Sequence, residues 1–208
     1  MKKILTILMS SMLLLGLTAC GSTGKTEPKA AAAPAVQNKS TQPAATSNKK
    51  GKVLVAYYSA SGTTKKVADI IAGVTGGTSF ELKPAEPYSN ADLDYNNSSS
   101  RVSKEHNNNA RVVKLTTTTV PNWADYDTVF IGYPIWWGIA AWPVDDFVKA
   151  NKFDGKKVIP FSTAASSGFG QSGKLLQQMN NTGTWVDGKC FHGTEKGEIE
   201  SWVKSLGF

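Results

Sequence analysis

Short apolar runs separated by polar turns are the main pattern in this chain beyond residue 51. The run at 52–58, Lys-Val-Leu-Val-Ala-Tyr-Tyr, is apolar without alternation, which is typical of a strand buried on both faces. Further strands are expected at 79–82, 128–133, 157–162 and 184–191. Because Pro160 has no backbone N–H, we expect a bulge or an early strand end at that residue.

Helical periodicity fills the segments between these strands. After the first strand, Val67, Ile70, Ile71 and Val74 lie on one face of a helix. The other expected helices carry their apolar residues at Val144, Phe147 and Val148 after Pro143, at Leu175, Leu176 and Met179, and at Ile199, Trp202, Val203 and Leu206. Strands alternating with helices predict an α/β fold, a doubly wound parallel sheet of five strands with helices on both faces. The expected strand order is 2-1-3-4-5, which places a ligand at the carboxyl ends of the strands, beside strands one and three.

The segment between the first strand and the first helix, residues 59–64, reads Ser-Ala-Ser-Gly-Thr-Thr. Small hydroxyl residues and a glycine let backbone N–H groups turn toward one point beside a positive helix N-terminus, which favours a phosphate. The candidate ligands are Ser59, Ser61, Gly62, Thr63 and Thr64. The alternative is an ordinary turn, because Ser, Thr and Gly favour turns in general.

Two further loops follow strands at the same edge of the expected sheet. The first consists of Pro134, Ile135, Trp136, Trp137 and Gly138, and its indole rings suit stacking on a planar ligand, although core or interface packing would also explain them. The second runs from Thr163 to Gly170, and its small residues would let the backbone approach the edge of a planar ring. Its candidate residues are Thr163, Ser166, Ser167, Gly168 and Phe169.

These three loops, in this order, resemble those of the flavodoxin family across nearly all of residues 52–208. The resemblance implies a flavodoxin-like fold and FMN as cofactor, with its phosphate on the 59–64 loop and its ring between the 134–138 and 163–169 loops. The family usually has a pair of glycines where this chain has Ala165 and Ser166. Residues 168–173 also match the dinucleotide pattern G-x-G-x-x-G, but that turn belongs after the first strand of its unit. We therefore interpret it as part of the flavin loop rather than an NAD site.

The N-terminus is typical of a bacterial lipoprotein signal. Lys2 and Lys3 precede an apolar stretch too short to span a bilayer comfortably, and Leu-Thr-Ala-Cys at 17–20 resembles a lipobox. We expect a signal peptide at 1–19 and lipid on Cys20, which would anchor an extracytoplasmic protein to a membrane. A plain secretory signal or an uncleaved anchor are the alternatives. Residues 20–51 form an expected disordered tether before one domain at 52–208.

Charge and cysteine content narrow the possible partners. The chain has 23 Lys and Arg residues, of which seven precede residue 52, and 16 Asp and Glu residues, of which one does. The expected domain therefore has 16 basic and 15 acidic side chains and a net charge of +1. Such a domain has no basic stripe for a nucleic acid. With Cys20 lipidated, Cys190 is left without an intramolecular partner, and we expect it to be a buried, inert thiol in a core strand. Neither His106 nor His192 has an acid or nucleophile at a spacing typical of a metal site or a catalytic motif, so we expect neither a metal site nor a Ser-His-Asp triad.

The segment 84–121 is longer than a connection needs and is interpreted as an insertion. Arg101 and Glu105 are spaced for an i, i+4 pair in a short helix. The insertion is either a lid over the flavin or a solvated excursion. Three functions remain open: an oxidoreductase acting on a small acceptor such as a quinone, an electron carrier to a protein partner, and a flavin-free module. Carriers in the flavodoxin family tend to be strongly acidic, so the near-neutral domain favours the oxidoreductase.

Overall fold

The computed structural model describes residues 51–109 and 111–208. The sheet follows the order β2-β1-β3-β5-β6, with all pairings along this path parallel. Its strands are β1 Lys52–Tyr57, β2 Thr78–Glu81, β3 Tyr126–Trp136, β5 Lys157–Thr163 and β6 Thr184–Trp185, with β7 Lys189–Phe191 also parallel to β5. The expected order 2-1-3-4-5 is therefore confirmed, except that the fifth strand is divided into two short segments.

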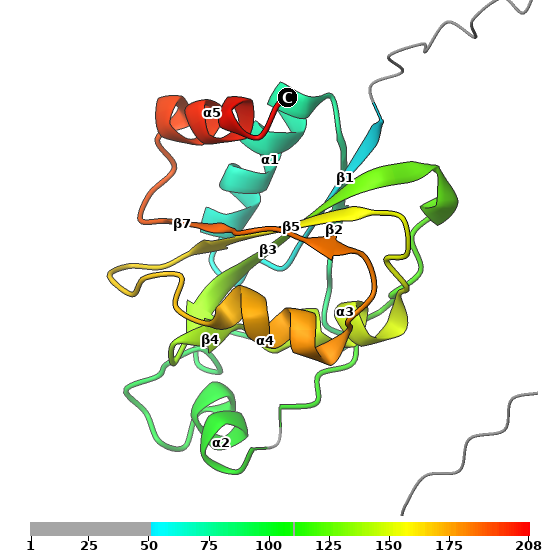
Figure 1. The fold of residues 1–208 in the computed structure, drawn as a ribbon. Helices are drawn as coiled ribbons and strands as arrows, with labels where there is room; N and C mark the ends of the chain where they lie inside the picture. The colour runs from blue at the N-terminus through cyan, green and yellow to red at the C-terminus, as the bar shows by residue number, and fades with distance from the viewer. Residues whose placement is uncertain (1–50, 110) are drawn as a thin grey trace, which may run out of the picture. The chain divides into compact units, whose positions relative to one another are not determined.

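Helices cover both faces of the sheet, as the apolar periodicity predicts (Figure 1). Helices α1, Thr63–Thr75, and α5, Lys196–Ser205, lie together on one face, and α3, Pro143–Ala150, and α4, Ser172–Met179, lie on the other. Each face has its own apolar core, because alternate residues of β1, β3 and β5 point to opposite sides. Leu54 and Val129 belong to the core under α3, and Val55 and Phe130 to the core under α1.

The expected interruption at Pro160 is wrong for its own strand, because β5 continues without a break to Thr163. The interruption occurs in the neighbouring strand instead. Val186 N donates to Val158 O, so residues 158 and 160 turn their backbone polar groups toward β6 and β7. Pairing along that edge stops after Val158 and resumes at Phe161. Among the described residues, no strand is therefore paired at Pro160 on the side where a backbone N–H would be needed.

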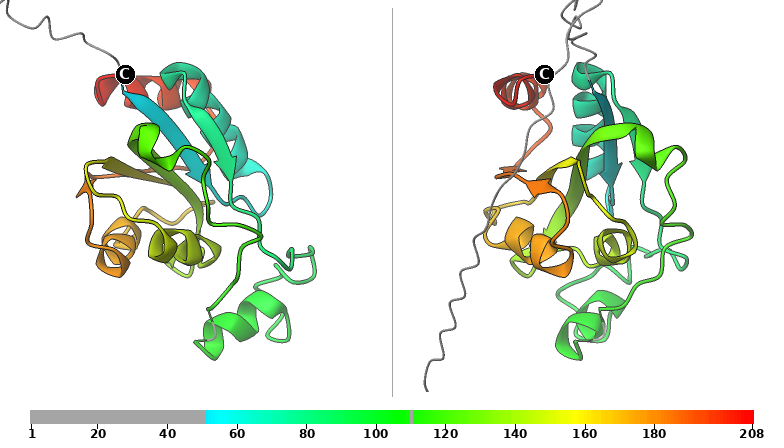
Figure 2. Two further views of the ribbon diagram at one scale, coloured as in Figure 1. Left: turned by 90° about the vertical axis from the view of Figure 1, so that its right-hand side faces the viewer. Right: turned by 45° about the vertical axis from the view of Figure 1, so that its right-hand side comes forward.

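An insertion separates β2 from β3 and extends beyond the layered domain (Figure 2). Pro84 and Leu115 form an isolated antiparallel bridge that closes its base. It contains α2, Arg101–Asn107, whose N-cap Ser100 accepts a hydrogen bond from Ser103 N. A 3-10 turn, Trp123–Asp125, then leads into β3. In Figure 1, α2 lies beside the hairpin of β3 and β4, Ile139–Ala140.

The predicted signal at 1–19, Cys20 and all of the tether except Gly51 lie outside the described residues. Within residues 51–109 and 111–208, no helix combines the length and apolarity that a bilayer crossing requires.

Candidate functional site

The loop between β1 and α1 presents hydroxyl groups at the start of a helix. Gly62 adopts the left-handed region, with φ 88°, and lets the chain turn into α1. Ser59 Oγ accepts hydrogen bonds from Gly62 N at 3.1 Å and Lys65 N at 3.2 Å. Because these bonds use both of its lone pairs, the Ser59 hydroxyl keeps its proton for an acceptor outside the loop. Ser61 Oγ and Thr63 Oγ1 lie 3.5 Å apart.

The electrostatics of this loop favour an anion. The first turn of α1 is Thr-Thr-Lys-Lys, so the side-chain charges there are positive. The helix dipole adds partial positive charge at the same end. Hydroxyl donors, backbone N–H groups and a helix N-terminus therefore meet in the segment 59–63, and this is the chemistry that a phosphate group requires.

Thr64 differs from the other predicted phosphate ligands, because its side chain points inward. It is 1% exposed, and its Oγ1 lies 2.7 Å from Thr163 Oγ1. Thr163, at the end of β5, is 4% exposed. The structure thus joins two predicted site residues to each other, and their hydroxyls connect the 59–64 loop to the third predicted loop.

The second predicted loop is a strand end followed by a tight hairpin. Pro134, Ile135 and Trp136 still belong to β3, and Trp136 pairs with Ile139 of β4. Trp137 and Gly138 form the two-residue turn with φ of 45° and 77°. Positive φ at both positions is the requirement of a type I′ turn, and it is uncommon for a residue as bulky as tryptophan. The turn therefore presents the Trp137 ring at a strained position.

The two tryptophans of the hairpin have different surroundings. Trp136 is half-buried and makes edge contacts with Tyr58, Tyr88 and Trp142, with ring centroids 4.8–5.7 Å apart. Trp137 is 42% exposed and stacks on His106 of the insertion at 4.4 Å and 10°. Packing accounts for Trp136, whereas Trp137 keeps accessible ring surface.

The third predicted loop lies next to the hairpin. A Cβ on Gly170 would lie 3.5 Å from Gly138 O, so the two loops are in van der Waals contact range. Ser166, Ser167 and Gly168 are exposed, and Ala164 N at the start of the loop donates to Phe191 O of β7. Cys190 Sγ contacts Ser167 O at 3.5 Å, and the His192 ring donates through Nδ1 to Ala164 O at 3.2 Å. The expectation that Cys190 is buried is wrong, because its short edge strand leaves it partly exposed.

Phe169 and Gly173, the last glycine of the G-x-G-x-x-G pattern, have packing roles. A Cβ on Gly173 would lie 2.9 Å from the Phe169 ring, and one on Gly188 would lie 2.4 Å from it. The absence of a side chain at Gly173 and Gly188 therefore creates the space that Phe169 fills. Ser172, at the start of α4, is fully buried, and its hydroxyl donates to Phe169 O at 2.7 Å. These contacts account for Gly173 without a dinucleotide.

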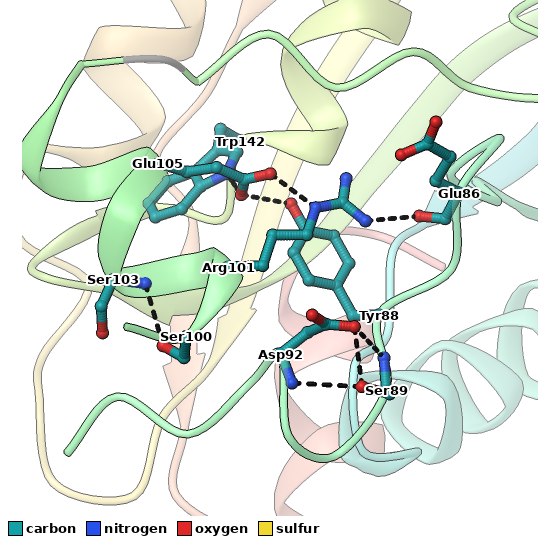
Figure 3. Close-up of polar contacts among 9 residues, drawn as sticks. All are labelled: Glu86, Tyr88, Ser89, Asp92, Ser100, Arg101, Ser103, Glu105 and Trp142. Carbon is teal, nitrogen blue, oxygen red and sulfur yellow. Dashed lines mark hydrogen bonds and ion pairs between the residues drawn. The ribbon is translucent and has the colours of Figure 1, made fainter. Parts of the chain in front are cut away.

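Helix α2 of the insertion holds a largely buried carboxylate at its centre (Figure 3). Glu105 Oε2 accepts hydrogen bonds from Tyr88 Oη at 2.6 Å and Trp142 Nε1 at 2.7 Å, and Arg101 Nε donates to Oε1 at 2.7 Å. The predicted Arg101–Glu105 pair is thus confirmed. Arg101 also lies 4.0 Å above the Tyr88 ring. Burial and the bond to Glu105 raise the pKa of the Tyr88 hydroxyl, which keeps it protonated as a donor.

His106, the next residue of α2, is held in a neutral form. Arg111 Nη2 lies 3.1 Å from His106 Nδ1, and since a guanidinium only donates, Nδ1 accepts. Burial and the charge of Arg111 lower the pKa of His106. Sequence reasoning missed the roles of His106, Trp142 and His192, because their partners are distant in sequence and no motif marks them.

A pocket of about 270 Å³ adjoins the 59–64 loop on the side of β2. Tyr58 and Tyr88 form its aromatic walls, Ser59 and Ala60 belong to the loop itself, and Pro84 and Pro87 come from the start of the insertion. Burial raises the pKa of the Tyr58 hydroxyl. Glu81 and Lys83 also line it, so the pocket combines aromatic and proline walls with hydroxyl groups and one ion pair.

Comparison with known proteins agrees with this architecture. A family model described as flavodoxin matches residues 52–206. A protein from Bacteroides uniformis assigned as a flavoprotein is 38% identical, with a TM-score of 0.69 over 74% of this chain and 98% of that one. One from Bacteroides eggerthii is 36% identical, with a TM-score of 0.68 over 76% and 98% of the two chains. A Lactobacillus acidophilus flavoprotein solved in complex with FMN shares the fold at 23% identity, with a TM-score of 0.54 over 73% and 98%. No curated protein matches the chain.

Proposed function

The chain belongs to the flavodoxin family, and we propose that it is an FMN-dependent oxidoreductase that exchanges electrons with a small acceptor such as a quinone. FMN is the cofactor, and when bound it supplies the redox chemistry, which the protein tunes through nearby rings, hydrogen bonds and charges. The observation that carries the proposal is the free donor capacity of the loop 59–63. Ser59 is held by two backbone N–H groups with its own proton left to donate.

The residues present fit FMN. Ser59, Ser61 and Thr63 would hold its phosphate, since hydroxyl and N–H donors meet there at a helix N-terminus, and Gly62, whose own N–H is donated to Ser59 Oγ, provides the left-handed turn into α1. Trp137, Gly138 and the exposed Ser166–Gly168 segment would border its ring, because these two loops adjoin. Thr64 and Thr163 would not contact FMN but would fix the 59–64 and 163–169 loops to each other.

Two features support a small acceptor over a protein partner. The pocket between Tyr58, Tyr88 and Pro87 has walls suited to a single flat ring, and it shares Ser59 and Ala60 with the phosphate loop. The domain is near neutral, so it lacks the strong negative field that docks acidic carriers onto basic partners. The insertion then acts as a lid that shapes access to the flavin, because it supplies Pro87 and Tyr88.

The experiment begins with the visible spectrum of the purified protein, recorded with and without added FMN. Reduced protein is then mixed with a series of quinones, and the rate of flavin reoxidation is followed. An oxidoreductase should show saturation with the small acceptor, and Tyr88→Ala should raise the half-saturating concentration. A reoxidation rate that depends only on the identity of an added redox protein would establish a carrier instead. A protein that takes up no FMN would be a flavin-free module.

The proposed location is extracytoplasmic, with a membrane anchor on Cys20. Its support is the order of the N-terminal segments, in which a basic start and an apolar stretch precede Leu-Thr-Ala-Cys at 17–20. A lipid-linked domain outside the cytoplasm would meet membrane-soluble acceptors at high local concentration, which suits a quinone.

A further inference from the structure

We infer that Glu105 is a positioning residue for the Trp136–Trp137 hairpin, and that α2 is the support that holds Trp137 against the flavin. The inference rests on the proposed function, since it is the bound flavin that would meet Trp137. Its structural part, a clamp between α2 and the hairpin, stands on contacts within the described residues.

The first step is that Glu105 connects the insertion to α3. Its side chain is 13% exposed and accepts three hydrogen bonds, from Arg101, Tyr88 and Trp142. Figure 3 shows these groups converging on the one carboxylate. Tyr88 and Arg101 belong to the insertion, whereas Trp142 is the N-cap of α3. A buried carboxylate with charged and neutral donors makes strong hydrogen bonds, so this residue fixes α2 in place.

The second step is that Trp142 holds the hairpin. Its ring is 1% exposed, makes an edge contact with Trp136 at 4.8 Å, and stacks beside Trp137 at 5.9 Å and 25°. The indole N–H, the one polar group of Trp142's side chain, is used by Glu105. Fixing that N–H fixes the plane of the ring, and the ring plane in turn sets where Trp136 and Trp137 can lie.

The third step is that the neighbouring residue of α2 touches Trp137 directly. His106 stacks on its ring, and Arg111 keeps the imidazole neutral by donating to Nδ1. Successive residues of one short helix therefore hold Trp137 by two routes, Glu105 through Trp142 and His106 by stacking. Trp137 has a positive φ, which is costly for a bulky residue, so its position requires support from outside the turn.

The first measurement uses the protein without FMN, so that it is independent of the proposed function. In Glu105→Ala, the backbone amides of Ile139 and Ala141, which face β3 across the hairpin, should exchange hydrogen roughly ten- to a hundredfold faster, while those of β1 and β5 keep their rates. Glu105→Gln keeps one acceptor oxygen but places a donor against Arg101, so its rates should lie between. Asp92→Ala removes a carboxylate that accepts only from Ser89 in the same insertion, and should change none of the hairpin rates.

The second measurement uses the FMN-loaded protein. Glu105→Ala should shift the midpoint potential of the flavin and raise its fluorescence, Glu105→Gln should do so less, and Asp92→Ala should do neither. Unchanged hairpin exchange in folded Glu105→Ala would overturn the clamp, and if that variant does not fold, Glu105→Gln decides in its place. Faster exchange with an unchanged potential and fluorescence would overturn the positioning role. If the wild-type protein takes up no FMN, the proposed function fails, while the exchange rates still decide the clamp.

Discussion

Thr64 and Thr163 place their hydroxyl oxygens 2.7 Å apart in the interior, one at the first turn of α1 and the other at the last residue of β5. These residues are 99 positions apart in the chain. Their bond is therefore a direct connection between the loop proposed for the phosphate and the loop proposed for the flavin ring. A hydroxyl that is buried without its partner is costly, so the two threonines stabilise the site as a pair.

Thr64→Val or Thr163→Val alone should lower the free energy of unfolding by roughly 1–3 kcal/mol, because each leaves one buried hydroxyl without its partner. The double variant replaces both with side chains of the same shape and should recover most of that loss. Urea unfolding of the four proteins measures the coupling. Additive losses would show that the two hydroxyls act independently.

Thr63→Asp should weaken FMN binding strongly, since it places a negative charge where the phosphate is proposed to bind. Binding of riboflavin, which has no phosphate, should change far less, and the wild-type protein should prefer FMN over riboflavin. Thr63→Ser keeps the hydroxyl and serves as the matched control. Fluorescence titration of each protein gives the affinities, and equal wild-type affinity for the two ligands would contradict the phosphate assignment.

Trp137→Asn should raise the fluorescence of bound FMN without destabilising the protein. Asparagine followed by Gly138 is a favoured pair for a type I′ turn, so this variant removes the indole and preserves the hairpin. Trp136→Ala should instead lower the free energy of unfolding by about 3 kcal/mol, because it leaves a cavity among Tyr58, Tyr88 and Trp142. Steady-state fluorescence and urea unfolding distinguish the two roles. Unaltered flavin fluorescence in folded Trp137→Asn would argue against stacking.

Asp145→Asn should change how stability depends on pH. Burial raises the pKa of Asp145 to about 6, and the charge of Lys149 only partly opposes this. The folded state therefore holds this proton more tightly than the unfolded state, so Asp145 makes the free energy of unfolding fall as pH rises from about 4 to 6. The variant should lose that fall and gain on the order of 1–3 kcal/mol above pH 6 relative to the wild type. Unfolding at pH 4.5 and 7.5 gives the difference, and parallel pH profiles would contradict it.

Cys20→Ala should abolish lipid attachment, and the protein should then either be released or accumulate as an uncut precursor. Membrane fractionation with detection of the chain by size provides the measurement. A variant that stays in the membrane at the mature size would show that the anchor lies elsewhere.

Local patterns predicted the layered sheet well, since the central strands are continuous apolar runs and the helices carry apolar residues at helical spacing. The continuous apolar run at 52–58 contains β1, and of the four residues at helical spacing Val67 and Ile71 are buried in α1, while Ile70 and Val74 are half-buried. Pro160 shows the limit of such reasoning. A missing N–H predicts that some pairing must stop, but which strand stops depends on the direction in which the backbone groups point, and this is set by the assembled sheet.

The sequence predicted which loops form the candidate site, but not what each of their side chains contacts. Hydroxyl content identified the 59–64 loop, yet Thr64 turns inward because its partner Thr163 comes from a strand far along the chain. Trp136 and Trp137 are adjacent and identical in residue type, so the sequence does not distinguish them. The hairpin register places Trp136 in the strand, where it packs, and Trp137 in the turn, where it is exposed. The Glu105 contacts likewise depend on where a long insertion returns to the domain.

The division of the last strand into β6 and β7 also affects whether copies of the protein can pair through the edges of their sheets. An edge strand carries unpaired backbone groups that can recruit another chain, and proteins suppress this with short, interrupted edges. Here one edge is formed by segments of two and three residues, and the other by the four residues of β2. Neighbouring copies of this domain would thus offer each other little template for intermolecular sheet growth.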